Sequence, residues 1–124
     1  MPRTVLIVDP DIAGNKLASL VLKQDGWVVI TATSAEEACV ALATFMPSLV
    51  VTELRLPDSD GMALVAQLRR QPTTQHLPIV ALTATHNPET ELESWTAGCV
   101  DFIQKPIDVM TFSAQLCHAL GAQP

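Results

Sequence analysis

The sequence predicts an α/β fold in which five parallel strands form one sheet with helices on both faces. Short, β-branched apolar runs alternate with segments of helical spacing along the whole chain. Right-handed crossovers between five such strand–helix units make the sheet parallel and cover both of its faces. The length of 124 residues and the hydrophobic content of 48% predict one domain with a sizeable core, over residues 1–120. Residues 121–124 are expected to be a tail or the start of a linker.

The first half of the chain carries clear start and stop signals for three strands and three helices. The strands are expected at 4–8, 27–32 and 49–52. Gly26 ends the first helix. Ser34 caps the second helix with Glu37 in the capping-box position, and Pro47 stops that helix after about residue 45. Asp60 caps the third helix.

The second half carries two more strands and two more helices. The strands are expected at 77–82 and 99–103. Between them, Asn87 and Pro88 form the cap and the first residue of a helix that Gly98 ends. The last helix is expected at about 108–120, with a core side made of Met110, Phe112 and Leu116.

Composition and charge exclude several classes of function. Thirteen acidic residues against seven basic ones give a formal net charge of -6, which would repel a nucleic-acid backbone. No apolar run approaches the ~18 residues of a spanning helix, and Met1-Pro2-Arg3 leads directly into a strand, so neither a membrane span nor a signal peptide is expected. Three widely spaced cysteines fit neither a disulfide framework nor a zinc site. We expect reduced thiols and a cytoplasmic protein.

Four polar residues follow or end strands that should lie side by side. Asp9 follows the first strand, Glu53 ends the third, Thr83 ends the fourth and Lys105 follows the fifth. In an open parallel sheet, the carboxyl ends of the strands form the functional edge. The sequence therefore predicts that two carboxylates, a hydroxyl and an ammonium converge there.

These residues and their neighbours resemble the receiver domains of two-component response regulators over essentially the whole chain. The matching segments are Val5-Leu6-Ile7-Val8-Asp9, Leu56-Pro57, Asp60-Gly61, Leu82-Thr83-Ala84, Ala97-Gly98 and Phe102 with Lys105-Pro106. The resemblance implies a flavodoxin-like (βα)5 fold with strand order 2-1-3-4-5. It implies an aspartate phosphorylated at the end of the third strand, and a Mg2+ site built from that residue and an acidic pair after the first strand. It also implies that Thr83 and Lys105 grip the phosphoryl group, that Phe102 follows them as a switch, and that the bond before Pro106 is usually cis.

The sequence departs from the family pattern at two positions, and both belong to the chemistry. Glu53 occupies the phosphoacceptor position, and Pro10 occupies the second position of the acidic pair. One extra methylene displaces the nucleophilic oxygen, and a displacement of about 1 Å can cost on the order of 100-fold in rate. Pro10 removes an oxygen ligand from a hard cation. Since phosphoryl transfer relies on the metal, the two losses compound.

Several residues keep two interpretations. Asp9 and Asp11 form an acidic pocket that could hold Mg2+, or Asp9 could cap the first helix and bond Lys105 without metal. Arg55 could supply the positive charge that the metal supplies in the family, or it could be a solvated surface residue. Trp95 continues a buried stripe from Leu92, or it joins Phe102 on the face that the family uses for dimers and targets.

Three functions follow from these interpretations. The favoured one is a receiver-like signalling module, not an enzyme, that escapes normal phosphorylation and acts by protein contact through the fourth helix, fifth strand and fifth helix. Its partner would be a histidine kinase, an output domain or a second copy. The second is a working phosphoacceptor that uses Glu53 or a neighbour such as Asp58 with Mg2+. The third, a flavodoxin-like nucleotide binder, is weakened because Asp9-Pro10-Asp11 is no phosphate loop.

Overall fold

Five strands alternate with five helices along the part of the chain that the structure, a computed structural model, describes: residues 3–84 and 87–121. The strands are β1 (Thr4–Val8), β2 (Val28–Ala32), β3 (Leu49–Glu53), β4 (Ile79–Thr83) and β5 (Asp101–Gln104). The helices are α1 (Ile12–Gln24), α2 (Ala35–Thr44), α3 (Gly61–Arg70), α4 (Pro88–Ala97) and α5 (Phe112–Leu120). The order and type of every expected element are confirmed.

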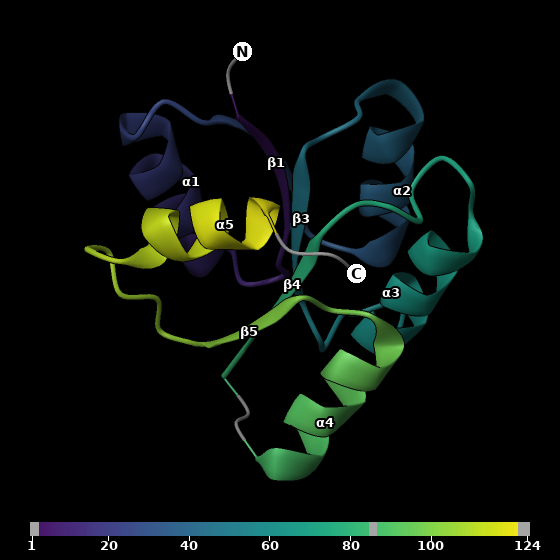
Figure 1. Cartoon of the computed structure of the whole chain (residues 1–124). Helices are drawn as coiled ribbons and strands as arrows, with labels where there is room; N and C mark the ends of the chain where they lie inside the picture. The colour runs from purple at the N-terminus through teal and green to yellow at the C-terminus, as the bar shows by residue number, and fades with distance from the viewer. Residues whose placement is uncertain (1–2, 85–86, 122–124) are drawn as a thin grey trace.

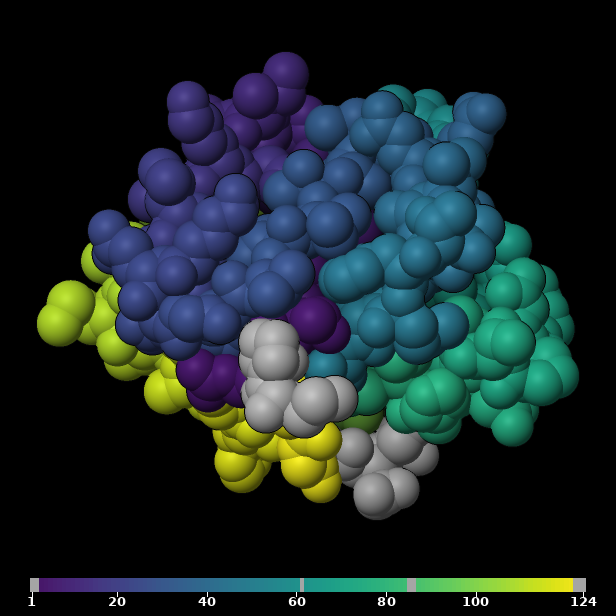
Figure 2. Space-filling view, turned by 90° about the horizontal axis from the view of Figure 1, so that it is seen from above, coloured from purple at the N-terminus to yellow at the C-terminus, as the bar shows by residue number. Residues whose placement is uncertain are grey.

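The strands form one parallel sheet in the order β2-β1-β3-β4-β5, as expected. Helices α1 and α5 cover one face of the sheet, and α2, α3 and α4 cover the other (Figure 1). Because every strand runs the same way, all five carboxyl ends lie at one edge, which is the lower edge in Figure 1. Figure 2 is seen from the opposite side, where the strands begin.

Two apolar cores fill the space between the sheet and its helices. Alternate residues of one strand enter different cores: Val5 and Ile7 of β1 pack in the core under α1 and α5, whereas Leu6 and Val8 pack in the other. All of β3 is buried, as the central strand of a doubly covered sheet should be. This sheet is the rigid support for the residues at its carboxyl edge.

The predicted N-caps of three helices are confirmed. The side chain of Asp60 accepts a hydrogen bond from the backbone N–H of Met62, and that of Asn87 accepts one from Thr90. Ser34 Oγ accepts one from the N–H of Glu37. The Glu37 carboxylate returns its bond to the N–H of Thr33 rather than to that of Ser34, so the capping box is shifted by one residue.

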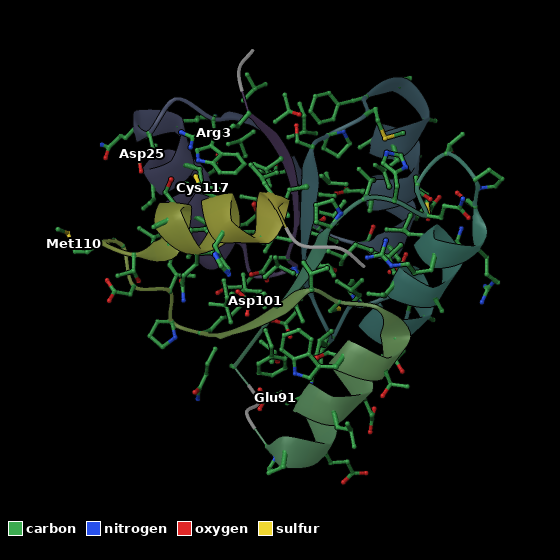
Figure 3. All side chains as sticks on the ribbon, in the orientation of Figure 1. Arg3, Asp25, Glu91, Asp101, Met110 and Cys117 are labelled. Carbon is green, nitrogen blue, oxygen red and sulfur yellow. The ribbon has the colours of Figure 1, made fainter. Side chains whose placement is uncertain are left out.

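The predicted start of the last helix is wrong by four residues. The carboxylate of Asp108 accepts a hydrogen bond from the N–H of Met110, and this turn delays the helix until Phe112. Met110 therefore lies outside α5 and is 87% exposed, so its predicted core position is wrong. Figure 3 shows its side chain pointing away from the molecule. The core positions of Phe112 and Leu116 are confirmed, because both are fully buried.

Helices α1 and α4 expose apolar residues that their spacing alone would assign to the core. Leu92 and Trp95 of α4 are exposed, so the buried-stripe interpretation of Trp95 is wrong. The buried residue of α4 is Ser94. Helix α1 likewise turns Leu17 and Leu20 toward solvent and buries small and polar side chains together with Leu22.

At the edge where the strands begin, Arg3 joins β1 to the helices of one face. Its guanidinium lies 4.9 Å from the centre of the Trp27 ring and donates hydrogen bonds to the Asp25 carbonyl and to Cys117 Sγ. Arg3, Asp25 and Cys117 lie together between α1 and α5 in Figure 3. Cys117, like Cys39 and Cys99, is a free thiol, as expected.

The helices of the described residues are unsuited to crossing a membrane. Among residues 3–84 and 87–121, none is both long enough and apolar enough to do so.

Candidate functional site

The four polar strand-end residues lie at the carboxyl edge of the sheet, as the sequence predicted. Asp9 follows β1 directly, Glu53 and Thr83 are the last residues of β3 and β4, and Lys105 follows β5. Asp9, Glu53 and Thr83 are at most 6% exposed. Carboxylates so deeply buried require a counter-charge, because burying an unpaired charge is very unfavourable.

Lys105 supplies that counter-charge to both carboxylates. Its Nζ lies 2.7 Å from Asp9 Oδ2 and 2.8 Å from Glu53 Oε2. These are the lengths of strong, charge-assisted hydrogen bonds. Burial alone would lower the pKa of Lys105, but the hydrogen bonds and negative charges of Asp9 and Glu53 outweigh it and raise the pKa above its ordinary value. Lys105 is therefore an ammonium at every physiological pH.

Backbone groups occupy the remaining oxygens of the two carboxylates. The N–H of Asp11 donates to Asp9 Oδ1 at 2.9 Å, and the N–H of Arg55 donates to Glu53 Oε1 at 3.3 Å. All four carboxylate oxygens thus have a donor from the protein. The interpretation of Asp9 as a partner of Lys105 fits this geometry. Its proposed role as the cap of the first helix does not, because the N-cap of α1 is Asp11 and Asp9 bonds only the N–H of that residue, ahead of the helix.

A buried amide that the sequence analysis did not single out fixes the backbone beside Asp9. Asn15 Nδ2 donates to the carbonyls of Asp9 and Ala32, both at 3.1 Å, and so ties α1 to the ends of β1 and β2. The signal was a polar residue two positions before Leu17 in a helix with apolar spacing. That spacing pointed to the wrong face, because Asn15 is buried and Leu17 is exposed.

The residues present do not fit the divalent cation that the family resemblance implies. Pro10 offers no side-chain oxygen, the carboxylates of Asp9 and Glu53 already hold Lys105, and Asp11 is exposed. Within residues 3–84 and 87–121, no group of three or more His, Cys, Asp or Glu side chains is placed to hold a metal ion. Oxygen-rich coordination is what such a cation requires.

Arg55 does not supply the compensating positive charge. It is exposed, and it reaches Glu53 through its backbone N–H. The cation at Glu53 is Lys105, the residue to which the family resemblance gave a role toward a phosphoryl group.

Asp58 is engaged away from the site. Its two carboxylate oxygens accept hydrogen bonds from the N–H groups of Ala35 and Glu36, both at 2.9 Å. These backbone hydrogen bonds lower the pKa of Asp58, and the charge stabilises the N-terminus of α2. This geometry gives no support to Asp58 as an alternative phosphoacceptor.

Thr83 and Phe102 lie on the β4–β5 side of the site. The Thr83 carbonyl accepts a hydrogen bond from the N–H of Lys105 at 2.9 Å, so backbone pairing holds the lysine beside β4. Phe102 is half-buried and packs against the core under α2 and α3. The peptide bond between Lys105 and Pro106 is cis, as the resemblance implied.

A cavity of about 320 Å3 opens beside Lys105 on the α1 side. It is lined by Asp9, Asp11, Gly14, Leu17, Leu82, Ala84, Lys105, Pro106 and Ile107. Glu53 is not among these residues, so solutes that enter the cavity meet Lys105 and Asp9 first.

Comparisons with known proteins agree with this architecture. Residues 5–116 match the model of the response regulator receiver domain. A 14.6 kDa protein of Leptolyngbya boryana, described as uncharacterized, is 33% identical over 84% of this chain and 79% of its own length. The response regulator PleD of Caulobacter vibrioides is 31% identical over 91% of this chain, but the chain spans only 25% of PleD.

The solved structures give the same result. The crystal structure of a putative response regulator from Chloroflexus aurantiacus has a TM-score of 0.93 and 31% identity, and the match covers 98% of this chain and 100% of that one. With the parallel sheet, the strand order and the residues at its carboxyl edge, these matches establish that the chain belongs to the family of response regulator receiver domains.

Proposed function

We propose that the chain is a receiver-like signalling module, cytoplasmic and folded over residues 1–120, that is not phosphorylated in the usual way. In this proposal it is not an enzyme, and its output is a protein contact with a histidine kinase, an output domain or a second copy. The observation that carries the proposal is the ion-paired arrangement of Glu53, Lys105 and Asp9 at the position where the family places its phosphoryl chemistry.

The geometry of Glu53 argues against its use as a phosphoacceptor. One of its oxygens bonds the Lys105 ammonium and the other accepts the N–H of Arg55. A nucleophilic oxygen must be aligned with the phosphorus atom, and these bonds orient both oxygens toward the protein. Since the described residues around Glu53 do not fit a metal ion, the developing charge of the transfer would lack its usual stabilisation.

The same geometry supports Glu53 as a built-in partial mimic of the phosphorylated state. Its carboxylate makes with Lys105 the kind of charge-assisted bond that a phosphoryl group makes, with fewer oxygens and less charge. Because β3 and β4 are paired with Glu53 opposite Leu82, Thr83 lies one residue further along the neighbouring strand. In our proposal Thr83 and Phe102 follow the Glu53 charge and bias a two-state face.

The proposed contact face comprises α4, β5 and α5. Trp95 is 43% exposed on α4, beside the exposed Leu92, and aromatic residues are enriched at protein interfaces. Phe102 on β5 links this face to the carboxyl edge of the sheet. The acidic residues of α4 and the net charge of -6 favour a protein partner over nucleic acid.

Phosphorylation tests the proposal directly. Incubated with a small phosphodonor and Mg2+, the wild-type domain should gain no phosphoryl group in intact-mass spectra. Glu53→Asp should restore little, whereas Glu53→Asp with Pro10→Asp should restore much more, because both the acceptor and the metal ligand return. Stoichiometric, base-labile labelling of the wild type would instead establish a working phosphoacceptor. Equal labelling of the two variants would make Pro10 irrelevant.

The proposed mimicry is tested with Glu53→Gln, which keeps the size and removes the charge. The variant should self-associate or bind its partner less and should shift the fluorine NMR signal of fluorophenylalanine at Phe102. The chain has three phenylalanines, and the fully buried Phe112 is the internal control. If the folded variant leaves both readouts unchanged, Glu53 is a fixed scaffold residue.

A further inference from the structure

We propose that the groove between α3 and α4 is a contact surface for a second copy of this chain, and that the two copies are joined by Arg70 of each with Glu89 of the other. The two helices lie side by side on one face of the sheet (Figure 1). The contact is separate from the α4–β5–α5 face: Glu93 lines the groove, and Trp95 lies two residues later, which is about 200° around the helix. The inference therefore does not rest on the proposed function.

The shape of the groove is the first argument. It is shallow and mainly apolar, with a volume of about 440 Å3, and is lined by Met62, Ala66, Leu92, Glu93, Thr96 and Ala97. Leu92 is 66% exposed, whereas Ala66 and Ala97 carry only a methyl group. A second copy related by a twofold axis across the groove would place its Leu92 over these alanines. By symmetry, its own alanines would receive Leu92 of the first copy.

The charges at the two ends of the groove are the second argument. Arg70 is the last residue of α3 and continues the four-residue spacing of Met62 and Ala66. Glu89 lies in the first turn of α4, one turn before Glu93. Arg70 and Glu89 are both exposed, and neither has an ion pair with any other residue that the structure describes. One end of the groove is thus basic and the other acidic.

These two charges are far apart within one copy. The Arg69 guanidinium donates to the carbonyl of Gly98, so the C-terminal ends of α3 and α4 lie together. Glu89 precedes Ala97, the last residue of α4, by eight positions, which is about 12 Å along the helix axis. A twofold axis across the groove reverses the helices and brings Arg70 of each copy opposite Glu89 of the other. The charges of the surface are therefore complementary to those of a second copy.

Sedimentation equilibrium tests whether the two copies associate. The groove is small, so the Kd should be on the order of 100 µM at low ionic strength. Wild-type protein should then be mostly dimeric at about 1 mM and monomeric at about 10 µM. Added salt should shift it toward monomer, because the ion pairs are exposed.

Charge reversal in both copies tests the proposed pairs. Arg70→Glu and Glu89→Arg should each raise the Kd at least about tenfold, because each places like charges opposite one another at both symmetric positions. An equimolar mixture of the two variants should form a heterodimer with about the wild-type Kd, since both pairs are attractive again. The double variant should dimerise alone for the same reason. Charges that served only their own helix ends would give no such rescue.

Two matched variants locate the contact on the surface. Leu92→Gln should raise the Kd about tenfold, whereas Leu20→Gln should leave it unchanged, since Leu20 is an exposed leucine of α1. Trp95→Ser should also leave it unchanged. Circular dichroism should show that every variant is folded, because all the substituted residues are exposed.

Three results would overturn the inference: wild-type protein that is monomeric at about 1 mM, a mixture of the charge-reversed variants that is no more dimeric than its components, or a Trp95→Ser or Leu20→Gln variant as disruptive as Leu92→Gln. None of these readouts involves phosphorylation or Glu53. The inference can therefore fail while the proposed function stands, and the reverse also holds.

Discussion

Two partly buried cations, Lys105 at the carboxyl edge and Arg69 at the junction of α3 and α4, solve the problem of burial in different ways. Lys105 binds two carboxylates. Arg69 binds backbone carbonyls instead: its guanidinium donates to the oxygens of Gly98, Leu77 and Gln75. Lys105 neutralises negative charge, and Arg69 supplies hydrogen-bond donors to backbone carbonyls outside the helices and strands.

The pKa values move in opposite directions for this reason. Burial lowers the pKa of Arg69, and the negative charge of the nearby Cys99, when ionised, opposes that effect. Burial also acts on Lys105, but its two carboxylates reverse the outcome and raise the pKa. The comparison teaches that Lys105 is the counter-charge of a buried acidic pair. Arg69 instead holds together, through backbone carbonyls, the residue that follows α4 and the segment before β4.

The largest effect on stability is expected at Arg69. Arg69→Met leaves the carbonyls of Gly98, Leu77 and Gln75 without their charged donor, and should lower the free energy of unfolding by about 3 kcal/mol. The neighbouring Arg70 is exposed, so Arg70→Met should change it by no more than about 0.5 kcal/mol. Urea unfolding measures both. Equal effects would show that Arg69 is an ordinary surface residue.

Alkaline pH should remove the stabilising effect of Lys105. At neutral pH the free energy of unfolding of the wild type should exceed that of the Lys105→Met variant by about 2 kcal/mol, a value that allows for partial exposure. Because the folded-state pKa is raised, this difference should be complete below the unfolded-state pKa of about 10.4 and should disappear as pH rises through the higher folded-state value.

The chain has no tyrosine to titrate in that range, which makes unfolding measurements there easier to interpret. A difference that already falls between pH 7 and 9 would contradict the raised pKa of Lys105.

A smaller effect on stability is expected at Gly98, which the Arg69 side chain contacts. Gly98 ends α4 with φ of 115°, and a Cβ atom there would come within 2.8 Å of Arg69 Nε. Gly26 also has a positive φ but has open space at that position. Gly98→Ala should therefore cost about 1 kcal/mol more than Gly26→Ala, and the excess should vanish in an Arg69→Ala background. An excess that persists would place its origin in the backbone.

The smallest effect is expected at Asp58, on the exposed loop that follows Glu53. Asp58→Asn removes the charge from the N-terminus of α2 and should lower Tm slightly at pH 7. Its lowered pKa means that the contribution is complete above the unfolded-state value of about 3.9 and is lost as pH falls through the folded-state value. The Tm difference from wild type should thus close in acid. A difference that is independent of pH would exclude the charge as its cause.

The fold could be predicted from the sequence because local signals and long-range packing agree. The apolar run of β3, the Asp60 cap and Gly98 each specify a boundary without reference to the rest of the chain. Side-chain burial was harder to predict. Leu17 and Trp95 have helical spacing but lie on exposed faces, because the helix side that meets the sheet carries smaller residues such as Ala18 and Ser94.

The composition of the site could be predicted, but not its connections. Strand ends in a parallel sheet bring Asp9, Glu53 and Lys105 to one edge by topology alone. Which cation Glu53 would choose depended on distances: Arg55 is two residues away in sequence but exposed, whereas Lys105 is 52 positions away and lies at 2.8 Å. The tie from Asp58 to α2 crosses more than twenty residues and has no local signal at all.

The contrast between the two tryptophans gives the molecule its own optical reporters. Trp27 is 3% exposed, donates its indole N–H to Ser113 Oγ and lies under Arg3, so its emission comes from a buried site. Trp95 is 43% exposed on α4. A soluble quencher such as acrylamide will reach Trp95 far more readily than Trp27. The fraction of fluorescence that it quenches is thus a direct measure of how much of the α4 face is covered, without any label attached to the protein.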